Sequence, residues 1–168
     1  MIVLNPGSDI DLDSDLQKVT ISQASATDAQ DVARLVAALL LELEPQAKAE
    51  LAAMRIPEQA KSLLADQLIY AFIARLADEA IGVITLHRCA ALYAGGVFGE
   101  ISELYVLPEY RSLKLGKQLV NHAVKFAAAQ GWQRLEVGAP PLAEFSRTQQ
   151  FYEANGFICT GQRLRKLV

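Results

Sequence analysis

The chain has 168 residues, which fits one domain and is long enough to bury a hydrophobic core without disulfides or metals. Hydrophobic residues make up 52% of the chain and charged residues 21%, which is typical of a folded globular protein and excludes a disordered one. The formal net charge of -3 and the pI of about 5.4 give no electrostatic basis for binding nucleic acid.

The sequence also bears on the cellular location of the protein and on whether it binds a metal. The start of the chain has no cationic segment followed by an apolar run, and no apolar stretch reaches about 18 residues. We therefore expect neither export nor a membrane span, and we place the protein in the cytoplasm. Cys89 and Cys159 lie far apart without metal-ligand spacing, so we expect buried strand residues and no metal site.

The N-terminal third predicts a leader, a strand and several helices. Residues 1–18 carry four aspartates and little periodicity, so we expect a loose leader ahead of a single domain over 19–168. A strand is expected at Val19 and Ile21. Thr27-x-x-Gln30 reads as a capping box for a helix that ends near Glu44, before Pro45. Two short helices are expected next, over Ala47–Met54 and Pro57–Ala65.

The middle of the chain predicts an antiparallel hairpin and a central strand. Leu68–Leu76 and Ile81–Leu86 are apolar runs separated by a turn, and Gly82 suits a bulge or a close backbone approach. The next strand is expected over Val97–Leu107. If this strand is regular, Glu100 and Glu103 point to opposite faces of the sheet. The lone His87 is expected to be a structural or surface residue.

A turn at Pro108 leads from this strand into an amphipathic helix that begins near residues 112–117. The first amides of a helix have no partner inside it, and the helix dipole adds positive charge there. Arg111, Lys114 and Lys117 add cations, and Gly116 permits close approach. The turn is therefore a candidate anion site, although a surface helix with solvated cations is equally consistent with the spacing alone.

The remaining elements complete the predicted sheet. After Gly131 ends the helix, we expect a strand at Arg134–Val137, a helix at Leu142–Ala154, and final strands at Phe157–Thr160 and Arg163–Val168. The apolar final strands offer an edge through which a homodimer could form.

The strand, the Pro-Glu-Tyr-Arg segment and the Leu-Gly-Lys segment before the helix resemble motif A of the GNAT superfamily of N-acetyltransferases, whose signature is R/Q-x-x-G-x-G/A. Arg111 matches its first position and Gly116 its last, whereas Lys114 replaces the middle glycine. The segment FYEANGF, which contains Tyr152, resembles the late helix and strand of this family. Many relatives carry an asparagine where this chain has Phe145.

The resemblance implies an α/β (α+β) fold with a mixed, mostly antiparallel sheet flanked by helices and a splayed central strand. It also implies acetyl-CoA as co-substrate. The implied contacts with pantetheine and pyrophosphate are the backbone and side chains of Leu104, Tyr105, Val106, Arg111, Ser112, Leu113, Lys114, Leu115, Gly116 and Lys117.

The resemblance also supplies candidates for the chemistry of acetyl transfer. Glu103, or in second place Glu100, could accept the proton of an amine. A backbone amide near Val106 could bind the thioester oxygen, and Tyr152 could protonate the departing thiolate. The alternatives are that Glu103 only pairs with a cation or lies at the rim of the sheet, and that Tyr152 only packs.

These residues predict transfer of acetyl from acetyl-CoA to a primary amine of a small molecule or peptide by direct attack, without a metal, nucleic acid or membrane partner. The acidic candidates slightly favour a cationic acceptor. Two alternatives stay open. One is transfer of a longer acyl group or to an acceptor other than an amine. The other is a non-catalytic acyl-CoA sensor or interaction module.

Overall fold

The computed structural model describes residues 18–111, 113–138, 142–161 and 166, with the backbone alone described over 142–145. The strands are β1 (Val19–Gln23), β2 (Tyr70–Leu76), β3 (Glu79–Ala91), β4 (Gly96–Val106) and β5 (Leu135–Val137). The α-helices are α2 (Ala29–Leu43), α3 (Lys48–Ala53), α4 (Ile56–Ala65), α5 (Leu115–Ala129) and α6 (Leu142–Ala154). Short 3₁₀ turns are η1 (Ala26–Asp28), η2 (Pro45–Ala47), η3 (Leu92–Ala94) and η4 (Pro108–Tyr110).

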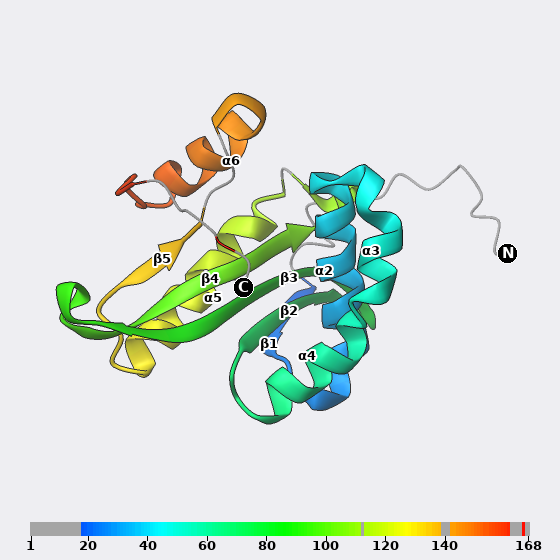
Figure 1. The fold of residues 1–168 in the computed structure, drawn as a ribbon, viewed down its shortest axis with the longest axis horizontal. Helices are drawn as coiled ribbons and strands as arrows, with labels where there is room; N and C mark the ends of the chain where they lie inside the picture. The colour runs from blue at the N-terminus through cyan, green and yellow to red at the C-terminus, as the bar shows by residue number, and fades with distance from the viewer. Residues whose placement is uncertain (1–17, 112, 139–141, 162–165, 167–168) are drawn as a thin grey trace, which may run out of the picture.

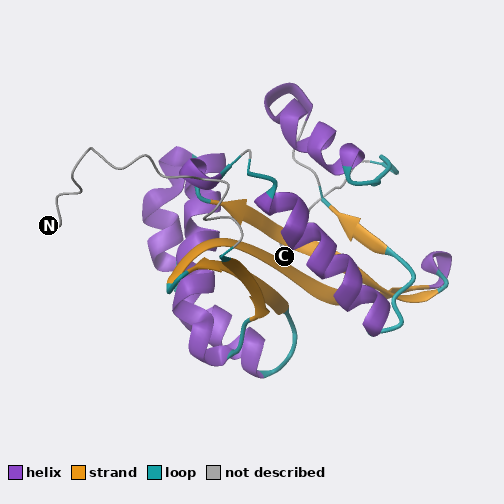
Figure 2. Cartoon of the chain, turned by 180° about the vertical axis from the view of Figure 1, so that it is seen from behind, coloured by secondary structure: helices purple, strands orange, loops and turns teal. Residues whose placement is uncertain are grey.

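The strands form one sheet in the order β1-β2-β3-β4-β5, in which every neighbouring pair is antiparallel except the parallel pair β4 and β5. Helices α2 and α4 cover one face (Figure 1), and α5 crosses the other face, which is nearer the viewer in Figure 2. This arrangement confirms the predicted mixed, mostly antiparallel sheet flanked by helices.

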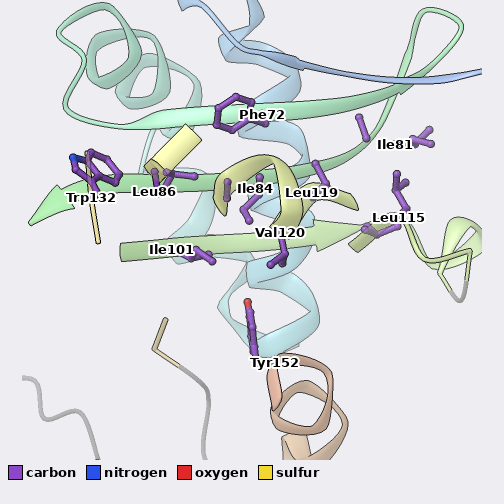
Figure 3. Close-up of a cluster of buried hydrophobic side chains, with 14 residues drawn as sticks. Phe72, Ile81, Ile84, Leu86, Ile101, Leu115, Leu119, Val120, Trp132 and Tyr152 are labelled. Atoms are coloured by element: carbon purple, nitrogen blue, oxygen red, sulfur yellow. The ribbon is translucent and has the colours of Figure 1, made fainter. Parts of the chain in front are cut away.

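Each face of the sheet has its own hydrophobic core. Leu119 and Val120 of α5 pack on Ile84 and Ile101 of the sheet, as Figure 3 shows. On the other face, Leu35 and its neighbours in α2 pack on the buried side chains of β2 and β3. Because apolar residues recur every three or four positions in both helices, each helix buries one stripe and leaves its other side to solvent.

Two predictions about element ends were wrong. The capping box is formed by Ser25 and Asp28 instead of Thr27 and Gln30, since Ser25 Oγ accepts from the amide of Thr27 and Asp28 Oδ2 accepts from the amide of Ser25. The same S-x-x-D spacing occurs two residues earlier, so a 3₁₀ turn precedes α2.

The segment Phe157–Thr160 is not a strand. Phe157 packs against the core, but Cys159, two residues further on, is exposed, so the segment does not bury a continuous apolar face. Arg163–Val168 lies outside the described residues except for residue 166. The edge on which a homodimer was predicted is therefore not formed by the part of the chain that the structure describes.

A bulge interrupts the pairing of β3 with β4 at Ser102. Thr85 pairs with Glu103 and Leu86 with Ile101, so Ser102 is one extra residue on β4. Inserting a residue reverses the alternation of side chains beyond it. As a consequence, Glu100 and Glu103 lie on the same face, which a regular strand would not allow.

The C-terminal half of β4 is splayed from β5. Their pairing covers only Gly99, Glu100 and Ile101 of β4. Beyond them, the amide of Leu107 donates to Ile81 O of β3 at 3.0 Å, so backbone groups of alternate residues point toward β3. The groups of Leu104 and Val106 consequently point into the gap that β5 leaves, which confirms the predicted splayed strand.

Candidate active site

The predicted anion turn connects η4 to the first turn of α5. Lys114 is the N-cap residue of α5, with a left-handed backbone at φ 60° and ψ 13° and without a capping bond from its side chain. The first amides of α5 therefore receive no bond from the side chain of their N-cap residue, which is an arrangement that suits an anionic ligand. Gly116 is the second residue of the helix, and Lys117 follows it on the exposed side.

A hollow of about 410 Å³ opens at this turn. It is lined by Val106, Tyr110, Arg111, Lys114, Leu115, Gly116, Lys117, Phe151, Ala154 and Asn155. The hollow thus combines the cationic turn, the splayed end of β4 and one side of α6. A somewhat larger hollow of about 480 Å³ near Gln67 and Gln130 has no charged residue in its lining, so it offers no comparable anion site.

Arg111 is committed to contacts within the protein. Its Nη1 and Nη2 donate to the two carboxylate oxygens of Glu42 at 2.9 and 2.6 Å, and its Nε donates to Val106 O at 2.9 Å. The guanidinium also lies 5.3 Å from the ring centroid of Tyr105. Hydrogen bonding to Glu42 raises the pKa of Arg111. Arg111 therefore links the end of α2 to β4 and the turn.

The acidic candidates lie together on the sheet face that α2 and α4 also occupy. Thr85 Oγ1 donates a hydrogen bond to Glu103 Oε2. The same Thr85 hydroxyl accepts a hydrogen bond from the backbone amide of Glu103 at 3.1 Å. Burial raises the pKa of Glu103, since the carboxylate is removed from water. Glu100 is 9% exposed and lies opposite His87. Two carboxylates on one face suit a cationic group, and the raised pKa of Glu103 suits it to accept a proton.

Tyr152 is part of the hydrophobic core and is 7% exposed. Its ring packs at 5.3 Å from the centroids of both Phe151 and Phe157, and Figure 3 shows it rising from α6 toward β4 and Val120. Burial raises the pKa of Tyr152 to about 12. The phenol therefore stays protonated at neutral pH and can donate a hydrogen bond.

The other predicted site residues are distributed unevenly. Leu104 and Val106 direct backbone groups to the open side of β4, whereas those of Tyr105 point toward β3, where it pairs with Val83. Leu115 is buried in the core beneath the turn, and Leu113 is half-buried. Ser112 and the side chain of Phe145 lie outside the described residues.

Sequence reasoning missed two features of this region. Glu42 gives no signal because it is 69 residues from Arg111. His87 and Cys89 of β3 meet Glu100 of β4 in a cluster of potential metal ligands. The spacing of His87 and Cys89, two apart on a strand, places them on one face and was a usable signal.

Comparisons with known proteins agree on the kind of domain. A family model described as an acetyltransferase (GNAT) domain matches residues 67–159, which contain the turn, the splayed strand and Tyr152. An aminoalkylphosphonate N-acetyltransferase of Salmonella typhimurium is 35% identical over 74 residues. That match covers 44% of this chain and 48% of the relative, so the chain spans about half the length of the curated relative it matches.

Solved structures share the fold at low sequence identity. A GCN5-related N-acetyltransferase from Ralstonia eutropha JMP134 has a TM-score of 0.76 and 21% identity, with 89% of this chain and 98% of that chain covered. An aminoglycoside N-acetyltransferase solved in complex with CoA has a TM-score of 0.70 and 18% identity, with 89% and 94% covered. No helix that the structure describes has both the length and the apolar character needed to span a membrane.

Proposed function

Since the chain belongs to the GNAT acetyltransferase family, we propose that it transfers the acetyl group of acetyl-CoA to a primary amine of a small molecule or peptide. The observation that carries the proposal is the hollow at the start of α5. There the first amides of α5, Lys114 and Lys117 lie beside the open backbone edge of β4. Such a site suits a ligand with a pyrophosphate at one end and an amide-containing arm at the other.

The anionic end would be bound by backbone and charge together. The first amides of α5 supply hydrogen bonds, and the two lysines supply positive charge. The arm would extend along β4, where the backbone groups of Leu104 and the amide of Val106 point to the side of β5, while Val106 O is held by Arg111. Because Arg111 is bound to Glu42 and Val106 O, we assign it to holding this edge in place and not to binding phosphate directly.

The acceptor amine must lose a proton before it attacks, and Glu103 is our candidate base. Its raised pKa brings it closer to neutral pH, where a general base works best. The bond from Thr85 fixes the orientation of the carboxylate. Glu100 on the same face adds negative charge, which favours a cationic acceptor.

Tyr152 suits a hydrogen-bonding role more than full proton transfer. Its pKa of about 12 lies roughly 3 to 4 units above that of an ordinary thiol, so complete transfer to a thiolate would be uphill by about 5 kcal/mol. A hydrogen bond to the developing thiolate avoids this cost and still stabilises the negative charge, by about 1.5–3 kcal/mol. Loss of the hydroxyl in Tyr152→Phe should then slow turnover about 10- to 150-fold.

Binding is tested by calorimetric titration of the folded chain with acetyl-CoA. Gly116→Glu places a negative charge in the first turn of α5, where it suits the helix dipole but repels phosphate. Gly116→Gln is the matched control of nearly equal size. The added Cβ lies 3.3 Å from the Phe151 ring in either variant, so circular dichroism verifies that both variants are folded. We expect wild type to bind, the glutamine variant to bind more weakly, and the glutamate variant to lose measurable binding. Equal affinity of the two variants would contradict a phosphate site at this turn.

Turnover is then measured as release of free CoA thiol with a panel of amines. The names of the two relatives described above suggest an aminoalkylphosphonate and an aminoglycoside as acceptors. A solved ribosomal-protein-alanine N-acetyltransferase from Brucella melitensis adds a peptide that contains alanine. Direct attack predicts intersecting double-reciprocal plots and no acetylated protein by mass spectrometry. Binding without turnover of any amine would favour the sensor alternative, and faster turnover of a longer acyl-CoA would favour another acyltransferase.

A further inference from the structure

A cluster of three different potential metal ligands lies across β3 and β4. His87 and Cys89 are two residues apart on β3, and Glu100 is the residue of β4 that pairs with His87. One ligand atom from each side chain lies within 4.8 Å of the others. Glu100 is buried, and both His87 and Cys89 are half-buried, so the cluster differs from an exposed patch of acidic residues.

The spacing is close to what a bound ion needs. Ligand atoms at zinc lie about 2.0–2.3 Å from the metal, which places neighbouring ligand atoms of a tetrahedral site roughly 3.3–3.6 Å apart. The distance from Cys89 Sγ to Glu100 Oε2 is already 3.9 Å. The strands that carry the three residues are paired in register, so the remaining difference lies in the side chains.

The bulge contributes a fourth residue that orients the imidazole. Ser102, the extra residue of β4, places its Oγ 2.9 Å from His87 Nδ1. A histidine that donates from one ring nitrogen to such a neighbour offers the lone pair of the other nitrogen to a metal. Ser102 would therefore orient the His87 imidazole toward the metal without binding the metal itself.

We propose that His87, Cys89 and Glu100 form a Zn²⁺ site. Thiolate and imidazole ligands select a borderline ion such as zinc, whereas Mg²⁺ and Ca²⁺ require more oxygen ligands than this cluster supplies. The three ligands found among the described residues leave one coordination position of a tetrahedral site for a further ligand. Binding forms a bond between zinc and sulphur and displaces the thiol proton of Cys89 to solvent. The proposal does not rest on the acetyltransferase function, although the two share Glu100, whose negative charge a bound zinc ion would offset.

The site is tested on the full chain after removal of metals with a chelator. Co²⁺ is the spectroscopic probe, because a cobalt-thiolate bond gives a near-ultraviolet charge-transfer band that oxygen and nitrogen ligands do not give. Zn²⁺ is titrated by calorimetry in two buffers of different ionisation enthalpy, which counts the protons released. Cys159→Ser is the matched control, since Cys159 is the exposed cysteine of this chain.

We expect one Zn²⁺ per chain, release of the thiol proton, and a charge-transfer band that zinc removes by displacing cobalt. Cys89→Ser should abolish the band, His87→Gln and Glu100→Gln should each weaken zinc binding strongly, and Cys159→Ser should change neither. Ser102→Ala should weaken binding by roughly 10- to 100-fold, as removal of a residue that orients a ligand does. Circular dichroism of each variant verifies that the fold is retained.

Two results would overturn the proposal. One is the absence of zinc binding to folded wild type. The other is a band or an affinity that survives Cys89→Ser but is lost in Cys159→Ser, which would assign the metal to the exposed thiol. Because these readouts do not involve acetyl transfer, failure of the zinc site and failure of the acetyltransferase proposal are distinguishable.

Discussion

Lys114 holds a backbone conformation that favours glycine, at the position where the family signature has its middle glycine. Its φ of 60° is left-handed, and it is the residue from which α5 begins. A left-handed residue other than glycine costs about 1–2 kcal/mol. Glycine in turn loses about 0.5–1 kcal/mol more conformational entropy on folding. We therefore expect Lys114→Gly to stabilise the protein by about 0.5–1 kcal/mol.

Thermal unfolding is a suitable assay for this gain. For a chain of this size, 1 kcal/mol corresponds to about 2–4 °C in Tm. Lys114→Ala is the matched control, because it removes the ammonium but keeps the Cβ. The Cβ is what makes the left-handed backbone conformation unfavourable. The alanine variant should have the stability of wild type or slightly less. A Lys114→Gly protein less stable than the alanine variant would refute the argument from backbone conformation.

The same pair separates charge from geometry in acetyl-CoA binding. If the ammonium of Lys114 contributes to phosphate binding, both variants should bind more weakly than wild type, and the difference should shrink as salt increases. If close approach of the backbone matters more, Lys114→Gly should bind more tightly than Lys114→Ala. Calorimetry at low and high salt measures both effects, and equal binding by all three proteins would place Lys114 outside the ligand site.

Three further predictions concern residues around the site. Because burial raises the pKa of Glu103, its contribution to stability is present at low pH and is lost as pH rises through the folded-state pKa. The Tm of Glu103→Gln should therefore rise relative to that of wild type toward neutral pH, and its turnover there should fall. A gain that appears only in acid would contradict this sign. A Cβ at Gly99 would lie 2.5 Å from the ring of buried Trp132, so Gly99→Ala should destabilise by about 1–3 kcal/mol in urea unfolding. Glu42→Gln should lower the free energy of unfolding by only about 0.5–1 kcal/mol, because the Glu42–Arg111 pair is about half exposed. The same variant should raise the KM for acetyl-CoA, because the turn is held less firmly. An unchanged KM would show that the pair does not position the turn.

The sequence by itself determined most of the elements. Apolar residues at helical spacing defined α2 and α5, and alternation between turn residues defined the hairpin of β2 and β3. Pro108 marked the end of β4, and the cations after it marked the turn. These features depend on neighbours along the chain, which is why local pattern was enough to find them. The family signature depends on the same short segment.

Only the tertiary structure decided what the side chains of the site contact. The bulge at Ser102 puts Glu100 and Glu103 on one face, and it is visible only in the pairing of β3 with β4. The sequence predicted Arg111 as a cofactor contact, and its pair with Glu42 is a further contact that only the packing of α2 beside the turn reveals.

Burial and the pairing of distant strands account for the remaining differences. Tyr152 is enclosed by the core, which raises its pKa, and no spacing along the chain encodes that burial. The expected strand at Phe157–Thr160 has strand-like residues but does not pair in the sheet. A strand, a buried carboxylate and a cluster of metal ligands each require groups from distant segments, so their energies are set by the packed fold and not by local sequence.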